Sequence, residues 1–157
     1  MKKEKNQLVA QVADVHLIDK FSDRPGVWLS VTGSAYYQLY SQALSDIGLK
    51  PSWVTALALI EQFAGITQSE LGRKLKINRA SAMALATAMN DSDLITRTKL
   101  AKLNQTALNL SETGLNKLTQ ACDIETNISN QILENIDKME REKFVTLLKE
   151  LYRLMTK

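Results

Sequence analysis

Two helix starts lie eleven residues apart in the segment TQSELGRKLKINRASAMALATAMND, and they constrain the fold more than any other feature. Thr67 followed three residues later by Glu70 is a capping box, in which each side chain binds the other's backbone N–H. Asn78 is a good N-cap for a second helix, which we expect to run to about Asn90. Only two helical turns fit between Thr67 and Lys76. The segment therefore predicts two helices joined by a tight turn.

Two short strands are predicted after this pair of helices. Residues 94–98 and 106–110 read as strands, and residues 99–105 would form the tip of the hairpin between them. Two short helices joined by a tight turn and followed by a two-stranded hairpin is the order of a winged helix-turn-helix. The fold class predicted here is therefore mainly α, with a small β-hairpin wing.

Further helices are predicted on both sides of this region. Glycine and proline are scarce, six and two in 157 residues, which favours helices over a turn-rich β-sandwich. Residues 27–47 and 52–63 read as helices, with Gly48 and Pro51 as the stop and start between them. Two helices follow the wing. Their caps are Ser111 and Asp137, and their apolar positions are Leu115, Leu118, Cys122, Ile128, Ile132 and Ile136 in one and Phe144, Leu147, Leu148, Leu151 and Leu154 in the other.

The helix that begins at Asn78 has two faces with different tasks. Helical spacing places Ala82, Leu85, Ala86 and Met89 on a face that packs on the domain. The opposite face has few long charged side chains, so it can lie deep in a DNA major groove, where methyl groups meet thymine methyls and polar groups bind base edges. The alternative is an ordinary buried alanine-rich helix. The candidate reading residues are Asn78, Arg79, Ser81, Met83, Ala84 and Thr87.

Positive charge is concentrated around these helices. Residues 73–102 hold seven Lys or Arg and two Asp, a net charge of +5, against +3 for the whole chain. A local positive field is the expected footprint of a polyanionic partner, and a solvated basic face is the alternative. Cations flanking the reading helix would bind phosphates and set its register. The candidate DNA contacts outside that helix are Gln68, Ser69, Arg97, Lys99 and Lys102.

Composition disfavours other kinds of site. One cysteine, Cys122, excludes an internal disulfide, and with the single His16 it excludes a Cys/His zinc site. The sequence has no Gly-rich phosphate loop, no metal cluster and no candidate nucleophile next to His16, so we expect neither an enzyme nor a cofactor. No apolar run approaches the roughly 20 residues that span a bilayer, and the N-terminus lacks the apolar core of a signal peptide. We therefore expect a cytoplasmic location and no membrane partner.

A longer part of the sequence resembles a known family. The stretch ITQSELGRKLKINRASAMALATAMNDSDLI, followed by LNLSETG, is similar to the MarR family of transcriptional regulators. That family has an L-T-x-x-E-L helix, a recognition helix, a Gly-Leu-hydrophobic strand start and an L-T-x-x-G after the wing. The stretch GLKPSWVTALALI also resembles the entry into the family's second helix, so the resemblance covers about residues 27–155. The matching positions are Leu71, Leu94, Leu110, Ser111 and Gly114.

The resemblance implies an architecture and a function. It implies an intertwined homodimer whose terminal helices form the interface, with two recognition helices on one pseudo-palindromic operator of double-stranded DNA. It also implies repression that a small molecule relieves. On this basis we expect an N-terminal extension (1–26), a helical dimerisation region (27–50 and 111–157) and a winged helix-turn-helix DNA-binding region (51–110), within one compact domain.

Several positions depart from the family pattern. Ala84 stands where the family often has Arg in the recognition helix, and Lys102 and Asn104 stand where it often has an Asp-x-Arg pair at the wing tip. Asp93 replaces a common Gly, which a left-handed turn tolerates. Because the missing arginines would read bases, we expect fewer direct base contacts and more reliance on DNA shape.

The resemblance also suggests a pocket between the dimer helices and the reading head, where family members often bind phenolic or aromatic acids. Tyr36 and Tyr40 share one helix face, with Trp28 two turns earlier, and Arg24 could pair with a carboxylate bidentately. The alternative is that the aromatic residues belong to the core or the dimer interface. The candidate ligand-binding residues are His16, Arg24, Trp28, Tyr36, Tyr40 and Trp53.

Two other functions remain open. A dimeric winged-helix protein-interaction module without DNA binding would fit the arginine-poor wing and reading helix, but it would not need the net charge of +5 over residues 73–102. A thiol-based oxidant sensor would use Cys122 in place of a bound aromatic effector. Cys122 lies between acids and within an apolar period, and we interpret it as a small core or interface residue.

Overall fold

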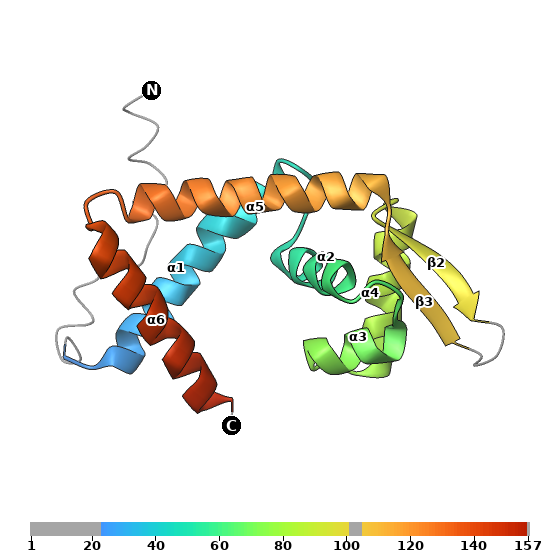
Figure 1. The fold of residues 1–157 in the computed structure, drawn as a ribbon, viewed down its shortest axis with the longest axis horizontal. Coiled ribbons are helices and arrows are strands. Elements are labelled where there is room, and N and C mark those ends of the chain that lie inside the picture. The colour runs from blue at the N-terminus through green and yellow to red at the C-terminus, as the bar shows by residue number, and fades with distance from the viewer. Residues whose placement is uncertain (1–22, 101–104, 157) are drawn as a thin grey trace. The chain divides into compact units, whose positions relative to one another are not determined.

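The computed structural model describes residues 23–100 and 105–156 and divides the chain into two compact units, Met1–Ile124 and Glu125–Lys157. Within these residues, the six helices and the two strands of the hairpin follow one another in the predicted order, and one further short strand was not predicted (Figure 1). Predictions that rest on residues before 23, His16 among them, and on Lys102 and Asn104 lie outside the described residues. The elements are α1 (Pro25–Ser45), α2 (Pro51–Gln62), β1 (Ile66–Thr67), α3 (Gln68–Leu75), α4 (Arg79–Asp91), β2 (Ile95–Leu100), β3 (Gln105–Leu110), α5 (Glu112–Ile132) and α6 (Lys138–Met155).

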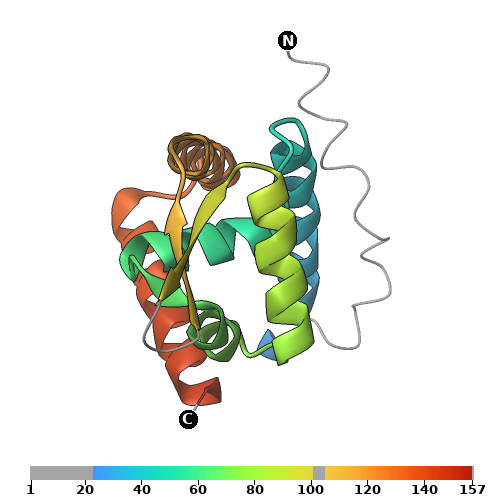
Figure 2. The ribbon, with the colours of Figure 1, turned by 90° about the vertical axis from the view of Figure 1, so that its right-hand side faces the viewer.

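The wing is a three-stranded antiparallel sheet, where the sequence predicts a two-stranded hairpin. Its strand order is β1-β3-β2, with Ile66 opposite Leu108 in one ladder and Ile95 opposite Leu110 in the other. A two-residue strand is too short to leave a period in the sequence, so β1 was missed. Thr67 belongs to β1 and also caps α3, so this strand ties the start of α3 to the wing. Figure 2 looks onto this side of the first unit, where the two long strands lie beside α4.

The core of the first unit gathers apolar side chains from α1 to α4, the strands and α5. On α4, Ala82, Ala86 and Met89 are buried and Leu85 is half-buried against the core, which confirms the predicted packing face. α3 approaches α4 closely, because a Cβ at Gly72 would lie only 2.9 Å from Cβ of Ala82. This packing leaves the opposite face of α4 in solvent. The largest fully buried side chains are Leu44, Leu57, Ile60, Leu71, Met89 and Leu108.

Hydrogen bonds join the turn between α4 and β2 to the first turn of α5. Asp93 has a φ of 55°, the left-handed conformation expected at this position. The Ser111 hydroxyl donates to the backbone carbonyl of Asp93 and accepts from the Gly114 N–H at 2.9 Å. The Thr113 hydroxyl donates to the Asp93 carboxylate at 3.0 Å. Ser111 is thus the predicted cap of α5, and Asp93 joins α5 to the base of the wing.

We interpreted Cys122 as a small core or interface residue, and the structure shows that it does not lie in the core. The apolar period placed Leu115 and Cys122 on a buried face of α5, but both are exposed. The buried residues of α5 are Gly114, Leu118 and Ala121. The period placed Leu118 correctly, but the buried face continues through the small residues Gly114 and Ala121, which a count of large apolar residues leaves out. The interface half of the interpretation remains a prediction.

The second unit contains the end of α5, a turn and α6. Asp137 caps α6 as predicted, because its Oδ1 accepts from the Glu140 N–H at 3.0 Å. The Arg141 guanidinium donates to the carbonyls of Ile136 at 2.7 Å and Glu134 at 3.4 Å, which closes the turn. Within the described residues of α6 none is buried, so its apolar side chains face solvent. Nowhere in the described ranges is a helix both long and apolar enough to cross a membrane.

Candidate nucleic-acid interface

A reciprocal capping box holds the start of α3, as predicted. Thr67 Oγ1 accepts from the Glu70 N–H at 3.3 Å, and the Glu70 carboxylate accepts from the Thr67 N–H at 2.9 Å and from its hydroxyl at 2.7 Å. The backbone bond, followed by the hydroxyl bond, favours the charged carboxylate and lowers the pKa of Glu70 below its ordinary value. This box fixes where Gln68 and Ser69 stand at the start of α3.

The turn from α3 to α4 is short because a left-handed residue ends one helix and a cap starts the next. Lys76 has a φ of 54° and ends α3. Two residues later, Asn78 Oδ1 accepts from the Ser81 N–H at 2.8 Å and caps α4, as predicted. The end of α3 therefore lies close to the start of α4, and Arg73 and Arg79 line the same groove.

Two cations of this turn already have partners. Lys74 Nζ lies 3.6 Å from the centre of the Phe63 ring, within the range of a cation–π contact. Arg73 Nη2 lies 4.0 Å from Glu70 Oε1, an exposed pair that contributes little to stability and leaves the guanidinium accessible. Arg73 and Arg79 are thus the guanidinium groups that this turn offers to an anion.

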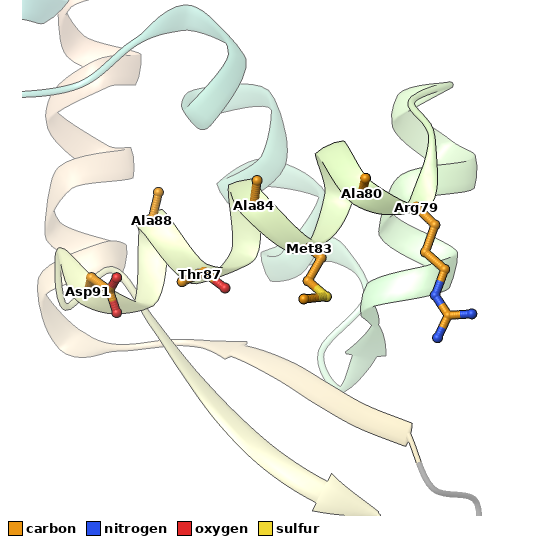
Figure 3. Close-up of a pocket in the computed structure, with 7 residues that line it drawn as sticks. All are labelled: Arg79, Ala80, Met83, Ala84, Thr87, Ala88 and Asp91. Atoms are coloured by element: carbon orange, nitrogen blue, oxygen red, sulfur yellow. The ribbon is translucent and has the colours of Figure 1, made fainter.

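The solvent face of α4 is a shallow hollow lined by two adjacent rows of side chains (Figure 3). Three alanines point to one side in the view, and the longer side chains point to the other. Met83 is 59% exposed and projects from the middle of the face. Four of the candidate reading residues come together here. The lining residues are Arg79, Ala80, Met83, Ala84, Thr87, Ala88 and Asp91.

A second groove runs between α3, the first turns of α4 and the wing. Four candidate DNA contacts line it: Gln68, Ser69, Arg79 and Met83. The Nε2 atom of Gln68 is buried and has no hydrogen-bond partner within the described part of the chain. Solvent does not reach this atom, so the exposed donors of the groove are the Ser69 hydroxyl and the guanidinium groups of Arg73 and Arg79. Thr106 of β3 completes its wall.

The wing contributes cations near α4. Arg97 and Lys99 of β2 are both exposed. Arg97 Nη1 donates to Thr87 Oγ1 at 3.4 Å, so this arginine reaches across to the solvent face of α4. Lys102 lies outside the described residues. Sequence reasoning missed Ala80, although its spacing of four residues from Ala84 places both on one face.

Arg73 and Thr106 were also missed as groove residues. Arg73 belongs to the basic cluster quoted from the sequence, but only the fold shows which of its cations lines the groove. Thr106 is distant from α3 and α4 in the sequence, and the sheet brings it to them. Ser81 is exposed on α4, yet it lines neither hollow.

The described candidate ligand residues lie at the N-cap position of α1, on α1 and on α2. The rings of Tyr36 and Tyr40 stack with centroids 6.0 Å apart. Tyr40 and Trp53 are half-buried against the core, from α1 and α2 respectively. Trp28 is 40% exposed on α1, and Arg24 stands at the N-cap position of that helix. Neither of the two hollows is lined by any of these residues.

Comparison with solved structures shows the fold clearly. A MarR family protein from Bacillus stearothermophilus superposes with a TM-score of 0.77 at 19% identity, covering 88% of this chain and 98% of that one. The transcriptional repressor CouR, bound to a 23-mer DNA duplex, gives 0.77 at 20% identity, with 86% and 96% covered. The MepR–DNA complex of Staphylococcus aureus gives 0.68 at 15% identity, with 87% and 99% covered.

Comparison by sequence matches one family model, over the middle of the chain. Residues 47–102 match the family model described as the MarR family, and this segment contains α2, α3, α4 and β2. By sequence, the chain matches none of the curated proteins. The family match covers the helix-turn-helix, and the solved structures extend the same fold over most of the chain. Residues 47–102 therefore carry the sequence pattern of the MarR family, and the chain has the winged helix-turn-helix fold of the MarR structures to which it is similar.

Proposed function

We propose that this regulator is a homodimeric, sequence-specific DNA-binding repressor that a small aromatic acid releases from its operator. The observation that carries the proposal is the solvent face of α4, an open hollow flanked by the cations of the α3–α4 turn and of the wing. A helix with short side chains and flanking cations is suited to the major groove, with the cations on phosphates. The proposal therefore places α4 in the groove and β2 beside the backbone.

The groove between α3, α4 and the wing supports a phosphate contact. It offers the hydroxyl of Ser69 and the guanidinium groups of Arg73 and Arg79, and Gln68 also lines it. Phosphate oxygens accept hydrogen bonds from amide, hydroxyl and guanidinium donors, and such contacts fix register on the duplex. We assign these side chains to phosphate binding, together with Lys99 and Lys102 of the wing.

The exposed apolar side chains of α6 support the homodimer. Large apolar side chains of a monomeric protein are seldom left in solvent over a whole helix, and such a face marks an interaction site. Phe144 is 45% exposed, Leu147 58% and Leu154 59%. A second copy of the chain, seated on this helix, would bury them and place two α4 helices on one pseudo-palindromic site.

The aromatic residues of α1 and α2 support the effector. Stacked Tyr36 and Tyr40 and half-buried Trp53 provide ring surface, and Arg24 provides a guanidinium for a carboxylate. Trp28 adds exposed ring surface on α1, and His16 is the remaining candidate. One similar structure, RdhR-CbdbA1625, is described as organohalide-sensing, which shows a protein of this fold with a small-molecule trigger.

Two alternatives rest on specific observations. Exposure of Cys122 favours a thiol-based oxidant sensor; in that case Cys122→Ser removes a peroxide response, and an unchanged response eliminates this alternative. The absence of arginine from the middle of the α4 face favours a protein-interaction module without DNA binding. Such a module would have no use for cations around α4.

The test of the proposed function is DNA binding by the full chain. Fluorescence anisotropy with duplexes from upstream of the protein's own gene, and with random duplexes of equal length, is measured at two salt concentrations. We expect tighter binding to one specific duplex, weakening as salt rises, and release by aromatic carboxylic acids. Equal binding to all duplexes at both salt concentrations would contradict the proposal and favour the interaction module.

A further inference from the structure

Between Arg79 and Asp91, the side chains that line the α4 hollow offer mostly carbon and sulfur, and Thr87 is the hydrogen-bonding side chain among them. Four neighbouring positions, Ala80, Met83, Ala84 and Ala88, line the hollow between Arg79 at one end and Asp91 at the other (Figure 3). Alanine side chains end at Cβ, so a partner can approach the helix backbone closely here. Met83 is 59% exposed, and its flexible thioether can pack against an irregular apolar surface.

The polar groups nearest this middle part are engaged within the protein. Thr87 Oγ1 accepts from Arg97 Nη1 at 3.4 Å, which turns the hydroxyl toward the wing. Asn78 Oδ1 accepts from the Ser81 N–H at 2.8 Å, so its oxygen is committed to the cap. An Asn reading adenine bidentately needs both its amide oxygen and its nitrogen, and this cap removes the oxygen. Asn78 and Thr87 thus each have a side-chain oxygen engaged within the protein, and Ser81 lines neither hollow.

The chemistry of the major groove then restricts what this face can recognise. Base edges there carry donors and acceptors, and the C5 methyl of thymine is the apolar group among them. Donors and acceptors pressed against Ala80, Met83 and Ala84 would lose water without gaining a partner, which is unfavourable. A thymine methyl in the same place would bury apolar surface on both sides.

We infer that α4 reads its operator by contact between the apolar middle of its face and thymine methyl groups, with Met83 and Ala84 as the residues that determine specificity. The inference rests on the proposed function and names the base feature that the same face recognises. It requires the half-site under α4 to contain thymines, and it requires the methyl groups of those thymines to contribute to affinity.

The test removes the methyl groups and nothing else. A half-site is first obtained by selecting tight-binding duplexes from a random pool with the full chain. Each thymine of that half-site is then replaced by deoxyuridine, which keeps the same donors and acceptors but lacks the C5 methyl. We expect affinity, measured by anisotropy at fixed salt, to fall about fourfold for each contacted methyl, the equivalent of one buried carbon group.

Variants connect the effect to α4. Met83 is exposed, so we expect Met83→Ala to fold normally. At one thymine, the loss of affinity on replacement by deoxyuridine should be smaller in this variant, because the thymine methyl then has less side chain to contact. Arg79→Ala is the matched control on the same helix. It should weaken binding to the thymine and uracil duplexes equally and leave their ratio unchanged, since a phosphate contact does not sense the methyl.

The outcomes separate this inference from the proposed function. Specific, salt-sensitive binding that deoxyuridine does not weaken would overturn the inference and leave the DNA-binding regulator intact. A selected half-site without thymine would do the same. Selection that yields no preferred sequence would overturn both. A fall in affinity on removal of the methyl, reduced by Met83→Ala and unchanged by Arg79→Ala, supports the inference.

Discussion

Gly114 is the residue whose size matters most at the junction of the wing and α5. A Cβ at this position would lie 1.9 Å from the carbonyl oxygen of Leu94 and 2.9 Å from its carbonyl carbon. Both atoms belong to the backbone, so no side chain can rotate to make room. Glycine here therefore allows α5 to begin directly against the base of β2.

Gly114→Ala should lower the free energy of unfolding by about 1–3 kcal/mol, the usual effect of overpacking a close contact. Urea denaturation followed by circular dichroism measures it. Gly26→Ala is the control, because a Cβ there has nothing within 4 Å. If both alanine variants were as stable as the parent, the close approach of α5 to Leu94 would be wrong.

Glu70 gives the stability of α3 a pH dependence. Its pKa is lowered in the folded state, mainly by the bond from the Thr67 N–H. A lowered pKa means that the stabilisation is complete above the ordinary carboxyl pKa and is lost as the pH falls through the lower value of the folded state. Glu70→Gln should therefore be less stable than the parent at neutral pH and equally stable in acid. A deficit that stays constant down to acid pH would show that the carboxylate charge plays no part.

Helix caps and helix faces in this chain were predictable because they are local. The Thr67–Glu70 box and the Asn78 cap depend on residues three apart, and the outward face of α4 depends on a period of 3.6 residues. Strand β1 and the exposure of Cys122 were not predictable in this way. Both depend on which segment lies alongside, which residues far away in the sequence decide.

The same distinction holds for the candidate site. The sequence indicates which side chains leave α4 toward solvent, but not what they bind. The contact of Arg97 with Thr87 joins β2 to α4 through residues ten apart in the sequence, and the burial of Gln68 Nε2 results from the fold around it. These two features show which side-chain groups of the candidate interface are already engaged or buried, and they cannot be read from the sequence.

At the scale of one element, Asn78 determines how well α4 forms. Asn78→Ala removes the acceptor for the Ser81 N–H and should lower the free energy of unfolding by about 1 kcal/mol. Asn78→Ser should retain most of the stabilisation that the cap provides, because serine is also a good N-cap residue. Chemical denaturation of the three proteins measures the difference. Equal stability of parent and alanine variant would mean that the cap contributes nothing.

At the scale of the whole molecule, we expect the exposed apolar side chains of α6 to form the interface of the proposed dimer. Leu151→Asp puts a charge on that face and should convert the proposed dimer to monomer, because an unpaired charge in an apolar interface is strongly unfavourable. Lys149→Asp is the matched control, since it adds the same side chain at an already charged position of the helix. Light scattering after size-exclusion chromatography gives the molar mass of each. A parent that is monomeric would contradict the dimer outright.

We expect the positive charge of residues 73–102 to make DNA binding depend on salt concentration. Residues 73–102 carry a net charge of +5, on a chain with +3 in all, and this segment contains α4. Phosphate contacts release counterions, and each one contributes about one unit to the slope of log affinity against log salt. The slope therefore counts phosphate contacts directly.

The most direct test of the account is that slope, measured by anisotropy on one specific duplex for the parent, Arg79→Ala and Arg79→Lys. We predict a steep slope for the parent, a slope lower by about one for Arg79→Ala, and the parent slope for Arg79→Lys, which keeps the charge. Specific binding with the same salt slope in the parent and both variants would mean that Arg79 does not contact a phosphate. The absence of specific binding in the parent would contradict the central claim that α4 reads DNA.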